Sequence, residues 1–168
     1  GKLAIEVVGP RTRRCSNLFD LGELSHLDVP VRAVSLYNAL PELMDILLTN
    51  DDGIDAPGFA ALEAGLSDLG TVWSVAPNRE RSGQSHALTL HSPLRAVERG
   101  ERRWAVDGTP ADCVYLALCQ LLPLTPAIVV SGINLGANVG ADVHYSGTVA
   151  AAREASLDGV RALAVSLD

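Results

Sequence analysis

The chain from residue 44 onward alternates short apolar runs with amphipathic segments and polar turns. Residues 45–49 (DILLT) are an apolar run that ends in Asn-Asp-Asp-Gly, which predicts a buried strand followed by a turn. Apolar residues at helical spacing predict a helix over 57–69 that Gly70 ends, and residues 71–76 (TVWSVA) predict the next strand.

The second half of the chain repeats this alternation. Thr109 is a predicted N-cap, with Pro110 at the first helical position and Asp112 in the first turn, and the helix runs to about residue 122. The remaining predicted elements are a strand at 127–130 (AIVV) that ends in Ser131-Gly132, a helix at 149–157 and a last strand at 160–167.

Between these halves lies a polar loop at 77–85 (PNRERSGQS), followed by extended segments at 86–90, 94–97 and 104–106. Apolar strands separated by helices predict an α/β fold with a mainly parallel sheet that helices cover on both faces. The extended segments predict an antiparallel β-hairpin beside this sheet.

Residues 1–43 lack a sustained hydrophobic period, so we expect short, weak elements there at most. Met44 is the only methionine of the chain and stands where the regular pattern begins. Two interpretations stay open: a natural start at Met44 preceded by a leader or an extended gene product, or a genuine N-terminal extension. The expected organisation is an extension of uncertain structure over 1–43 and one domain over 44–168.

Composition and charge narrow the classes of function. Hydrophobic residues make up 48% of the chain and aromatic residues 4%, so the core must consist of Ala, Val, Leu and Ile. The formal net charge is −7, and the only basic cluster is Arg11, Arg13 and Arg14. This argues against a nucleic-acid polymer as partner. An acidic protein still binds a small phosphate where a metal and backbone amides supply the positive field.

The cysteines and the hydropathy indicate where the protein works. Cys15, Cys113 and Cys119 show no CxxC spacing, and the last two fall in an apolar helical pattern that predicts buried thiols. The odd count favours a reducing compartment. No apolar run approaches the roughly 20 residues that span a bilayer, and no signal peptide is visible. We therefore expect a cytoplasmic protein without a membrane partner.

The candidate chemistry lies in polar loops that follow predicted strands, where doubly wound sheets bind their ligands. Asp51 and Asp52 can share one site only if the backbone turns, which Gly53 permits. A hard divalent cation offsets the repulsion between adjacent carboxylates. The alternative is an Asp-Asp-Gly turn with solvated carboxylates.

Two further loops carry weaker signals. Ser82 offers a hydroxyl oxygen, and the flanking Arg79 and Arg81 are expected to be solvated. Asn134 and Asn138 lie in a loop with evenly spaced glycines, where carbonyl oxygens suit magnesium or manganese and backbone amides suit phosphate. The alternatives are an ordinary loop serine and a turn that uses asparagine for its backbone conformation.

Ser146-Gly147-Thr148 opens a predicted helix, whose free amides either bind an anion or are simply capped. The four histidines make no metal spacing, and the GxSxG, GxxxxGK[ST] and GxGxxG motifs are absent. A serine hydrolase, a P-loop NTPase and a dinucleotide-binding oxidoreductase are thereby disfavoured.

Together these blocks resemble the SurE family of stationary-phase survival proteins in order and spacing from Met44 to about Leu167. The matching segments are residues 46–58 (ILLTNDDGIDAPG), 75–83 (VAPNRERSG), 107–114 (DGTPADCV), 131–138 (SGINLGAN) and 145–151 (YSGTVAA). The resemblance implies a Rossmann-like three-layer α/β/α fold. It also implies a nucleotidase that hydrolyses nucleoside 5′- and 3′-monophosphates, and in some members short polyphosphate.

By resemblance, one divalent cation, Mg²⁺ or Mn²⁺, is bound by Asp51, Asp52, Ser82 and Asn134. The phosphate pocket maps to Asn138, Ser146, Gly147 and Thr148. Asp52 is our candidate for the general base that activates water, and a covalent aspartyl-phosphate on either aspartate is the less favoured route.

The family normally begins near Met44 and continues past residue 168 through segments that its homo-oligomers exchange. Nothing is therefore carried over onto residues 1–43. The alternative function is a truncated, inactive domain that binds metal or nucleotide without turnover.

Overall fold

The computed structural model describes residues 3–8 and 44–168, which form a seven-stranded sheet in the order β1-β7-β6-β2-β3-β5-β4. Strands β7, β6, β2, β3 and β5 are parallel, whereas β1 and β4 pair antiparallel at the two edges. The bounds are β1 Leu3–Val8, β2 Met44–Thr49, β3 Gly70–Pro77, β4 Ala96–Gly100, β5 Arg103–Val106, β6 Ile128–Leu135 and β7 Ala162–Leu167. The predicted mainly parallel sheet is confirmed.

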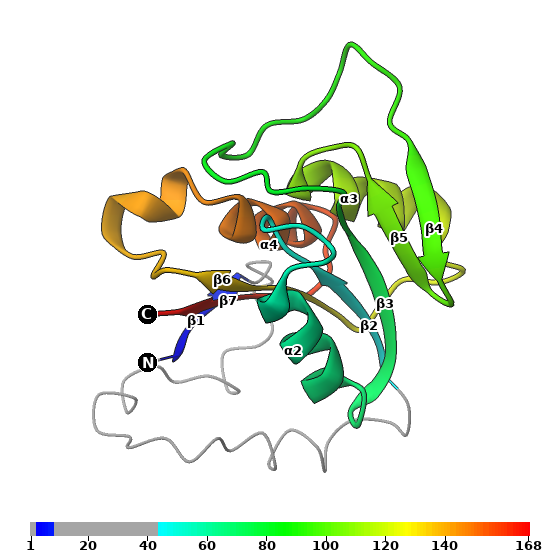
Figure 1. The fold of residues 1–168 in the computed structure, drawn as a ribbon, viewed down its shortest axis with the longest axis horizontal. Coiled ribbons are helices and arrows are strands. Elements are labelled where there is room, and N and C mark those ends of the chain that lie inside the picture. The colour runs from blue at the N-terminus through cyan, green and yellow to red at the C-terminus, as the bar shows by residue number, and fades with distance from the viewer. Residues whose placement is uncertain (1–2, 9–43) are drawn as a thin grey trace.

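Helices cover both faces of this sheet (Figure 1). Helix α2, Pro57–Leu66, packs on one face, and helices α3, Pro110–Leu116, and α4, Gly147–Leu157, pack on the other. A π-helical stretch η2, Ala117–Leu121, continues α3, and a short 3₁₀ helix η3, Gly140–His144, precedes α4. The arrangement is the Rossmann-like three-layer α/β/α fold that the resemblance implied.

The apolar run of β2 explains why both faces are covered. Ile46 and Leu48 pack into one cluster with Phe59 of α2, whereas Leu47 between them joins the cluster beneath α3 and α4. Successive side chains of a strand point to opposite faces. Because residues 46–48 of β2 are all apolar, this stretch must be buried on both sides, as central parallel strands are.

The start of α3 follows its prediction. The Thr109 hydroxyl accepts from the Asp112 backbone N–H at 3.1 Å, and the Asp112 carboxylate accepts from the Thr109 N–H at 2.8 Å. This capping box satisfies two amides that the first helical turn leaves free. The predicted end near residue 122 is also close, but the last turn is π-helical and not α-helical.

Of two elements predicted between β3 and α3, one is confirmed and one is wrong. The hairpin is confirmed as β4 and β5, which pair antiparallel. The extended segment at 86–90 was wrong as a strand, because its polar groups pair with α3 and not with the sheet. Thr89 donates its backbone N–H to Asp112, and the Ala87 carbonyl accepts from the Thr109 hydroxyl.

Strand β6 is longer than its apolar run. It continues past Val130 to Leu135, pairing Asn134 with Ser166 of β7 after a register shift that follows Ser131. A Cβ on Gly132 would lie 2.3 Å from the carbonyl oxygen of Val165, so only glycine lets the two strands approach this closely. Ser131 and Asn134 therefore lie on the strand, and the polar loop starts later than predicted.

The extension at 1–43 contributes one described element. Leu3–Val8 is a strand that pairs antiparallel with β7, from Leu3 opposite Leu167 to Val8 opposite Ala162. It covers an edge of β7 that would otherwise present unpaired backbone groups. The expectations for residues 9–43, Arg11, Arg13, Arg14, Cys15 and His26 among them, lie outside the described residues.

Cys113 and Cys119 were both predicted to be buried, and this is confirmed for one of them. Cys113 is buried in α3, and this burial raises the pKa of its thiol well above the ordinary value. Cys119 is exposed, so its predicted burial was wrong; it lies in the π-helical stretch, one turn beyond the buried part of α3. Among residues 3–8 and 44–168, no helix has both the length and the apolar character to cross a membrane.

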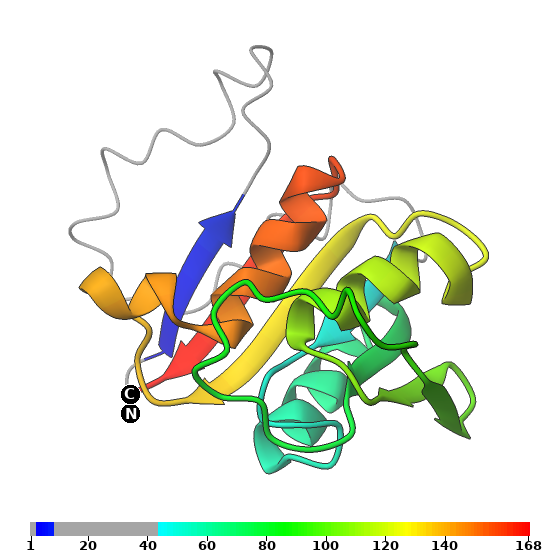
Figure 2. The ribbon, with the colours of Figure 1, turned by 90° about the horizontal axis from the view of Figure 1, so that it is seen from above.

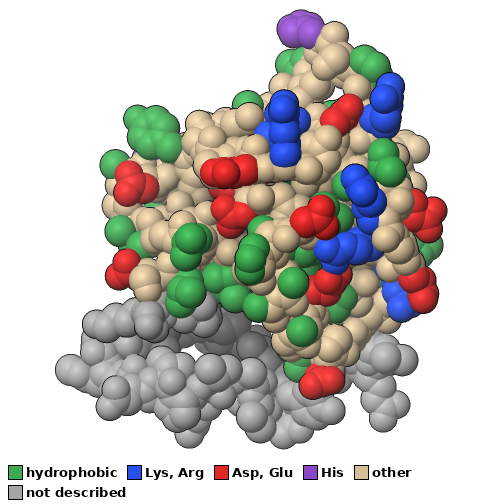
Figure 3. Space-filling model, viewed as in Figure 1, with side chains coloured by type: hydrophobic (Ala, Val, Ile, Leu, Met, Phe, Trp, Pro, Cys, Tyr) green, Lys and Arg blue, Asp and Glu red, His purple; other side chains and the backbone are tan. Residues whose placement is uncertain are grey.

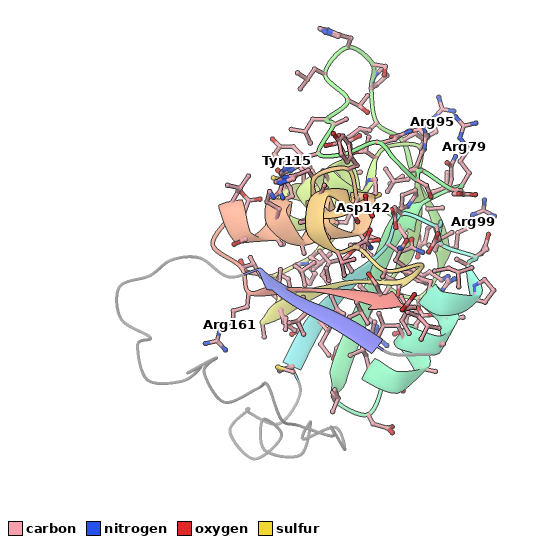
Figure 4. All side chains as sticks on the ribbon, turned by 90° about the vertical axis from the view of Figure 1, so that its left-hand side faces the viewer. Arg79, Arg95, Arg99, Tyr115, Asp142 and Arg161 are labelled. Carbon is pink, nitrogen blue, oxygen red and sulfur yellow. The ribbon has the colours of Figure 1, made fainter. Side chains whose placement is uncertain are left out.

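The charged side chains on the surface are of both signs, as the composition predicts. Figure 3 shows acidic and basic side chains interspersed over the described part of one face, without a continuous basic stripe there. In Figure 4 the side chains of Arg79, Arg95 and Arg99 lie along one side of the molecule, and Arg161 points outward at the opposite side. Arg79 is exposed, as expected.

Candidate functional site

Two candidate loops meet because their strands are neighbours. Strands β2 and β6 run parallel, with Thr49, the last residue of β2, opposite Ser131, three residues before Asn134 on β6. The loop that begins at Asn50 and the end of β6 at Asn134 therefore emerge at the same edge of the sheet. This is the edge at which parallel α/β sheets bind ligands.

A buried side chain, Asn50, shapes the turn that carries the aspartates. Its Nδ2 donates to the Gly53 carbonyl at 2.9 Å, and its Oδ1 accepts from the Gly53 N–H at 3.2 Å. Gly53 has a φ of 101°, which disfavours any residue with a Cβ. Asp51 and Asp52 thus lie in a turn that frees them from strand alternation. Sequence reasoning gave Asn50 no role, although a buried amide beside a turn glycine is a recognisable Asx-type signal.

Asp51 is held by the N-terminus of α4. The Thr148 hydroxyl donates to its Oδ1 at 2.5 Å, and a Cβ on Gly147 would lie 2.9 Å from its Oδ2. Burial raises the pKa of Asp51, while the Thr148 hydroxyl and the backbone amides of Asp51, Thr148 and Gly147 lower it. The helix N-terminus that was expected to face phosphate therefore also faces a carboxylate, which its dipole and free amides favour.

Asp52 is half-buried and lies among other acids. Burial raises its pKa, the negative charges of Asp51 and Glu80 raise it further, and the backbone amide of Leu135 lowers it. Leu135 follows Asn134 directly, so the structure brings Asp52 against the segment that carries Asn134. Glu80 was not among the residues that the sequence suggested.

Ser82 joins this group through its neighbours. The Arg81 backbone N–H donates to the Asp51 carbonyl at 2.7 Å, and the Ser82 hydroxyl donates to Glu80 at 3.0 Å. The Arg81 guanidinium donates to the Asp107 carbonyl at 3.1 Å. Arg81 is half-buried, so the expectation of a solvated arginine was wrong here, because the loop folds back over the start of α3.

The remaining candidates already have structural partners. Asn134 donates from Nδ2 to the Gly136 carbonyl at 2.7 Å, which leaves its Oδ1 available as a ligand. Asn138 donates to the Ser166 hydroxyl of β7 at 2.8 Å, one strand farther from Asp51. The Ser146 hydroxyl accepts from the Val149 N–H and caps α4. Of the predicted phosphate-pocket residues, Gly147 and Thr148 lie against Asp51.

The donor set fits a hard cation. Within the described ranges, no three His, Cys, Asp or Glu side chains cluster closely enough to hold a metal ion. A cation beside Asp51 and Asp52 therefore needs neutral oxygens as well, of the kind that Asn134 and Ser82 supply. Beneath α4, the buried hydroxyls of Thr49 and Ser131 make no hydrogen bond within the described residues, an uncommon situation in a protein interior.

Thr148 offers a specific test of this geometry. Thr148→Val keeps the shape of the side chain and removes the hydroxyl that donates to Asp51. Because Asp51 is buried, losing this donor removes a hydrogen bond to its carboxylate that water does not replace, at a cost of about 1–3 kcal/mol. We expect a matching fall in the free energy of unfolding, measured by urea denaturation. An unchanged midpoint would show that the bond contributes nothing.

The comparisons with known proteins identify the family of this chain. The family model described as "Survival protein SurE" matches residues 46–168. The chain belongs to the SurE family. The matched residues include Asp51, Asp52 and Asn134, whereas β1 lies outside them.

Individual relatives match the same part of the chain. The protein named 5′-nucleotidase SurE from Geotalea daltonii is 61% identical over 124 residues, which are 74% of this chain and 50% of that protein. Its namesake from Pelobacter propionicus is 60% identical over the same shares. The crystal structure of the SurE protein from Aquifex aeolicus matches with a TM-score of 0.68 at 45% identity, over 70% of this chain and 48% of that one. The chain thus spans about half the length of the relatives it matches.

Proposed function

We propose that this protein is a metal-dependent phosphomonoesterase that hydrolyses nucleoside 5′- and 3′-monophosphates, with short polyphosphate as a further substrate. The observation that carries the proposal is the position of Asp51 and Asp52. Both are acids with raised pKa values at the carboxyl end of β2, beside the end of β6 and the N-terminus of α4. The names of the relatives, 5′-nucleotidase SurE, support the same class of reaction.

The proposed metal ligands are Asp51, Asp52, Ser82 and Asn134, which would bind one Mg²⁺ or Mn²⁺. When bound, the cation would polarise the phosphoryl oxygens of the substrate and lower the pKa of a bound water. The two carboxylates supply negative charge, and the serine and asparagine supply neutral oxygens without adding repulsion. We place this site in a catalytic domain over 44–168, with residues 1–43 as an extension.

The chain's own groups would do the rest. Asp52 is half-buried beside Asp51. As the proposed general base, its carboxylate would accept a proton from the attacking water. Thr148 and the α4 amides fix Asp51 beside it. Gly147, Thr148, Ser146 and Asn138 form the proposed phosphate pocket, where backbone amides and the asparagine side chain would bind the transferring group.

Metal removal tests this function directly. We expect the full chain to release phosphate from AMP in the presence of Mn²⁺, to lose this activity on treatment with EDTA, and to regain it when Mn²⁺ is restored. The assay measures inorganic phosphate against time. Phosphate release that survives EDTA would contradict the proposal. Mn²⁺ binding without any release would instead favour the alternative, a domain that binds metal or nucleotide without turnover.

A further inference from the structure

A loop of nine residues lies beside the candidate site, over the starts of α4 and α3. Residues 81–89, here called the strap, follow β3 and pass over the N-termini of α4 and α3; Figure 2 shows this green segment lying across both helices. The strap carries Ser82, a proposed metal ligand, whose one side-chain hydrogen bond among the described residues is to Glu80 of the same loop. Its position relative to Asp51 must therefore be set by how the rest of the strap is attached.

The first attachment point after Ser82 is Ser85. Its backbone N–H donates to the Tyr145 carbonyl at 3.1 Å, and its hydroxyl donates to the His144 carbonyl at 2.7 Å. Ser85 has a φ of 54°, the left-handed region that non-glycine residues rarely adopt. A residue keeps such a conformation only where its surroundings enforce it, and such residues concentrate at functional sites. The residues that hold Ser85 in this conformation are His144 and Tyr145, which directly precede Ser146 and the start of α4.

The second attachment point is a bond between His86 and α4. His86 Nε2 lies 2.6 Å from Glu154 Oε2, and the exposed fractions of the two side chains are 20% and 10%. Glu154 lies on the helix whose first residues, Gly147 and Thr148, hold Asp51. One rigid helix thus positions Asp51 at its start and the strap along its length.

The far end of the strap is fixed to α3. Thr89 donates its backbone N–H and its hydroxyl to the two carboxylate oxygens of Asp112, at 2.9 and 2.6 Å. At the near end, the Arg81 N–H bonds to Asp51. Within the described part of the chain, residues 82–84 make no hydrogen bond to the helices or the sheet, and this short span contains Ser82.

We propose that Ser85, His86 and Glu154 are positioning residues that fix the Ser82 hydroxyl at the metal site by fastening the strap to α4. The inference rests on the proposed function, because it takes Ser82 as a ligand of the cation. Holding a ligand before the cation arrives removes the entropy cost of ordering it on binding. Loosening the strap should therefore weaken metal binding even where the fold stays intact.

Two variants of the full chain test this. Ser85→Gly accommodates the left-handed φ and removes the bond to His144, so it loosens the strap without a core defect. His86→Ala removes the bond to Glu154. For each variant, hydrogen exchange of residues 82–89 is measured in metal-free protein, and the Kd for Mn²⁺ by calorimetry. We expect faster exchange in the strap alone, and a Kd raised about tenfold, as when outer partners of metal ligands are removed.

The control and the conservative variant separate positioning from plain stability. Glu63→Gln disturbs a comparable contact on the other face of the sheet, where Glu63 bonds to Arg103 and Ser74. It should lower Tm while leaving strap exchange and the Kd for Mn²⁺ unchanged. Glu154→Gln keeps a hydrogen-bonding partner for His86 and should stay close to wild type in both readouts.

The outcomes distinguish a failure of the positioning role from a failure of the proposed function. If the wild-type chain binds Mn²⁺ and the loosened variants bind it equally well, the positioning role is wrong while the proposed function stands. Unchanged strap exchange in both variants overturns the positioning role as well. If the wild-type chain itself has no affinity for Mn²⁺, the proposed function fails first.

Discussion

Asp52→Asn is expected to lower kcat/KM for AMP by about 10²- to 10⁴-fold, the usual loss when a general base is removed. The amide keeps the shape of the side chain and an oxygen that can face a cation, but it cannot accept a proton from water. The same substitution removes a charge that burial and the neighbouring Asp51 and Glu80 disfavour. We therefore also expect Tm of the metal-free variant to rise above that of the wild type.

A matched control for this variant is Asp68→Asn. Asp68 is an exposed carboxylate in the turn between α2 and β3. This turn lies at the amino end of the parallel strands, whereas the candidate site lies at their carboxyl ends. Asp68→Asn should leave both kcat/KM and Tm close to wild type. Asp52→Asn activity within about threefold of wild type, far inside the loss that general-base removal implies, would rule out the assigned role. A lower metal-free Tm would contradict the argument from repulsion.

Gly147→Ala is the second substitution with a large expected effect. A Cβ at this position would lie 2.8 Å from Cβ of Asp51, 2.9 Å from its Oδ2 and 3.1 Å from Cγ of Pro110. Neither the proline ring nor the buried aspartate, which accepts from Thr148, yields readily, and overpacking of this kind costs about 1–3 kcal/mol. We expect a lower free energy of unfolding in urea, together with weaker Mn²⁺ binding because Asp51 is displaced.

Gly65→Ala provides the comparison. Gly65 lies in α2, and a Cβ there would meet no atom within 4 Å. Alanine should stabilise this helix by up to about 1 kcal/mol and leave Mn²⁺ binding unchanged. If Gly147→Ala behaved like Gly65→Ala in both measurements, the close packing of α4 on Asp51 would be refuted.

Much of the fold follows from local pattern. The run at 45–49 predicted a buried strand because three apolar residues stand in succession at 46–48, and Ile46, Leu47 and Leu48 do alternate between the two cores. The capping box at Thr109 and Asp112 is contained within four residues, so local spacing sufficed to find it. Elements that depend on nearby residues were therefore predictable.

The misses depend on distant contacts. Residues 86–90 looked extended, and they are irregular because α3 takes their hydrogen bonds across more than 20 residues of sequence. β6 runs past its apolar stretch because β7 supplies a partner for Asn134. The strand at Leu3–Val8 forms against β7, from the far end of the chain. No local period reports such pairings.

In the candidate site, too, local patterns were visible in the sequence and contacts between distant residues were not. Polar loops after strands, together with the resemblance, were enough to name Asp51, Asp52 and Asn134. The bond between Thr148 and Asp51 joins residues 97 apart in sequence, so no spacing could reveal it. Nor could sequence show that the α4 amides face a carboxylate, or that His86 of the strap contacts Glu154 of α4.

We propose that two neighbouring, partly buried carboxylates are kept together so that a hard cation binds between them and the end of β6. A crystal structure of the protein grown with Mn²⁺, with an anomalous difference map, tests this most directly. We predict one peak within bonding distance of oxygens of Asp51, Asp52 and Asn134. A map without a peak there, or with the manganese bound at another surface, would contradict the claim.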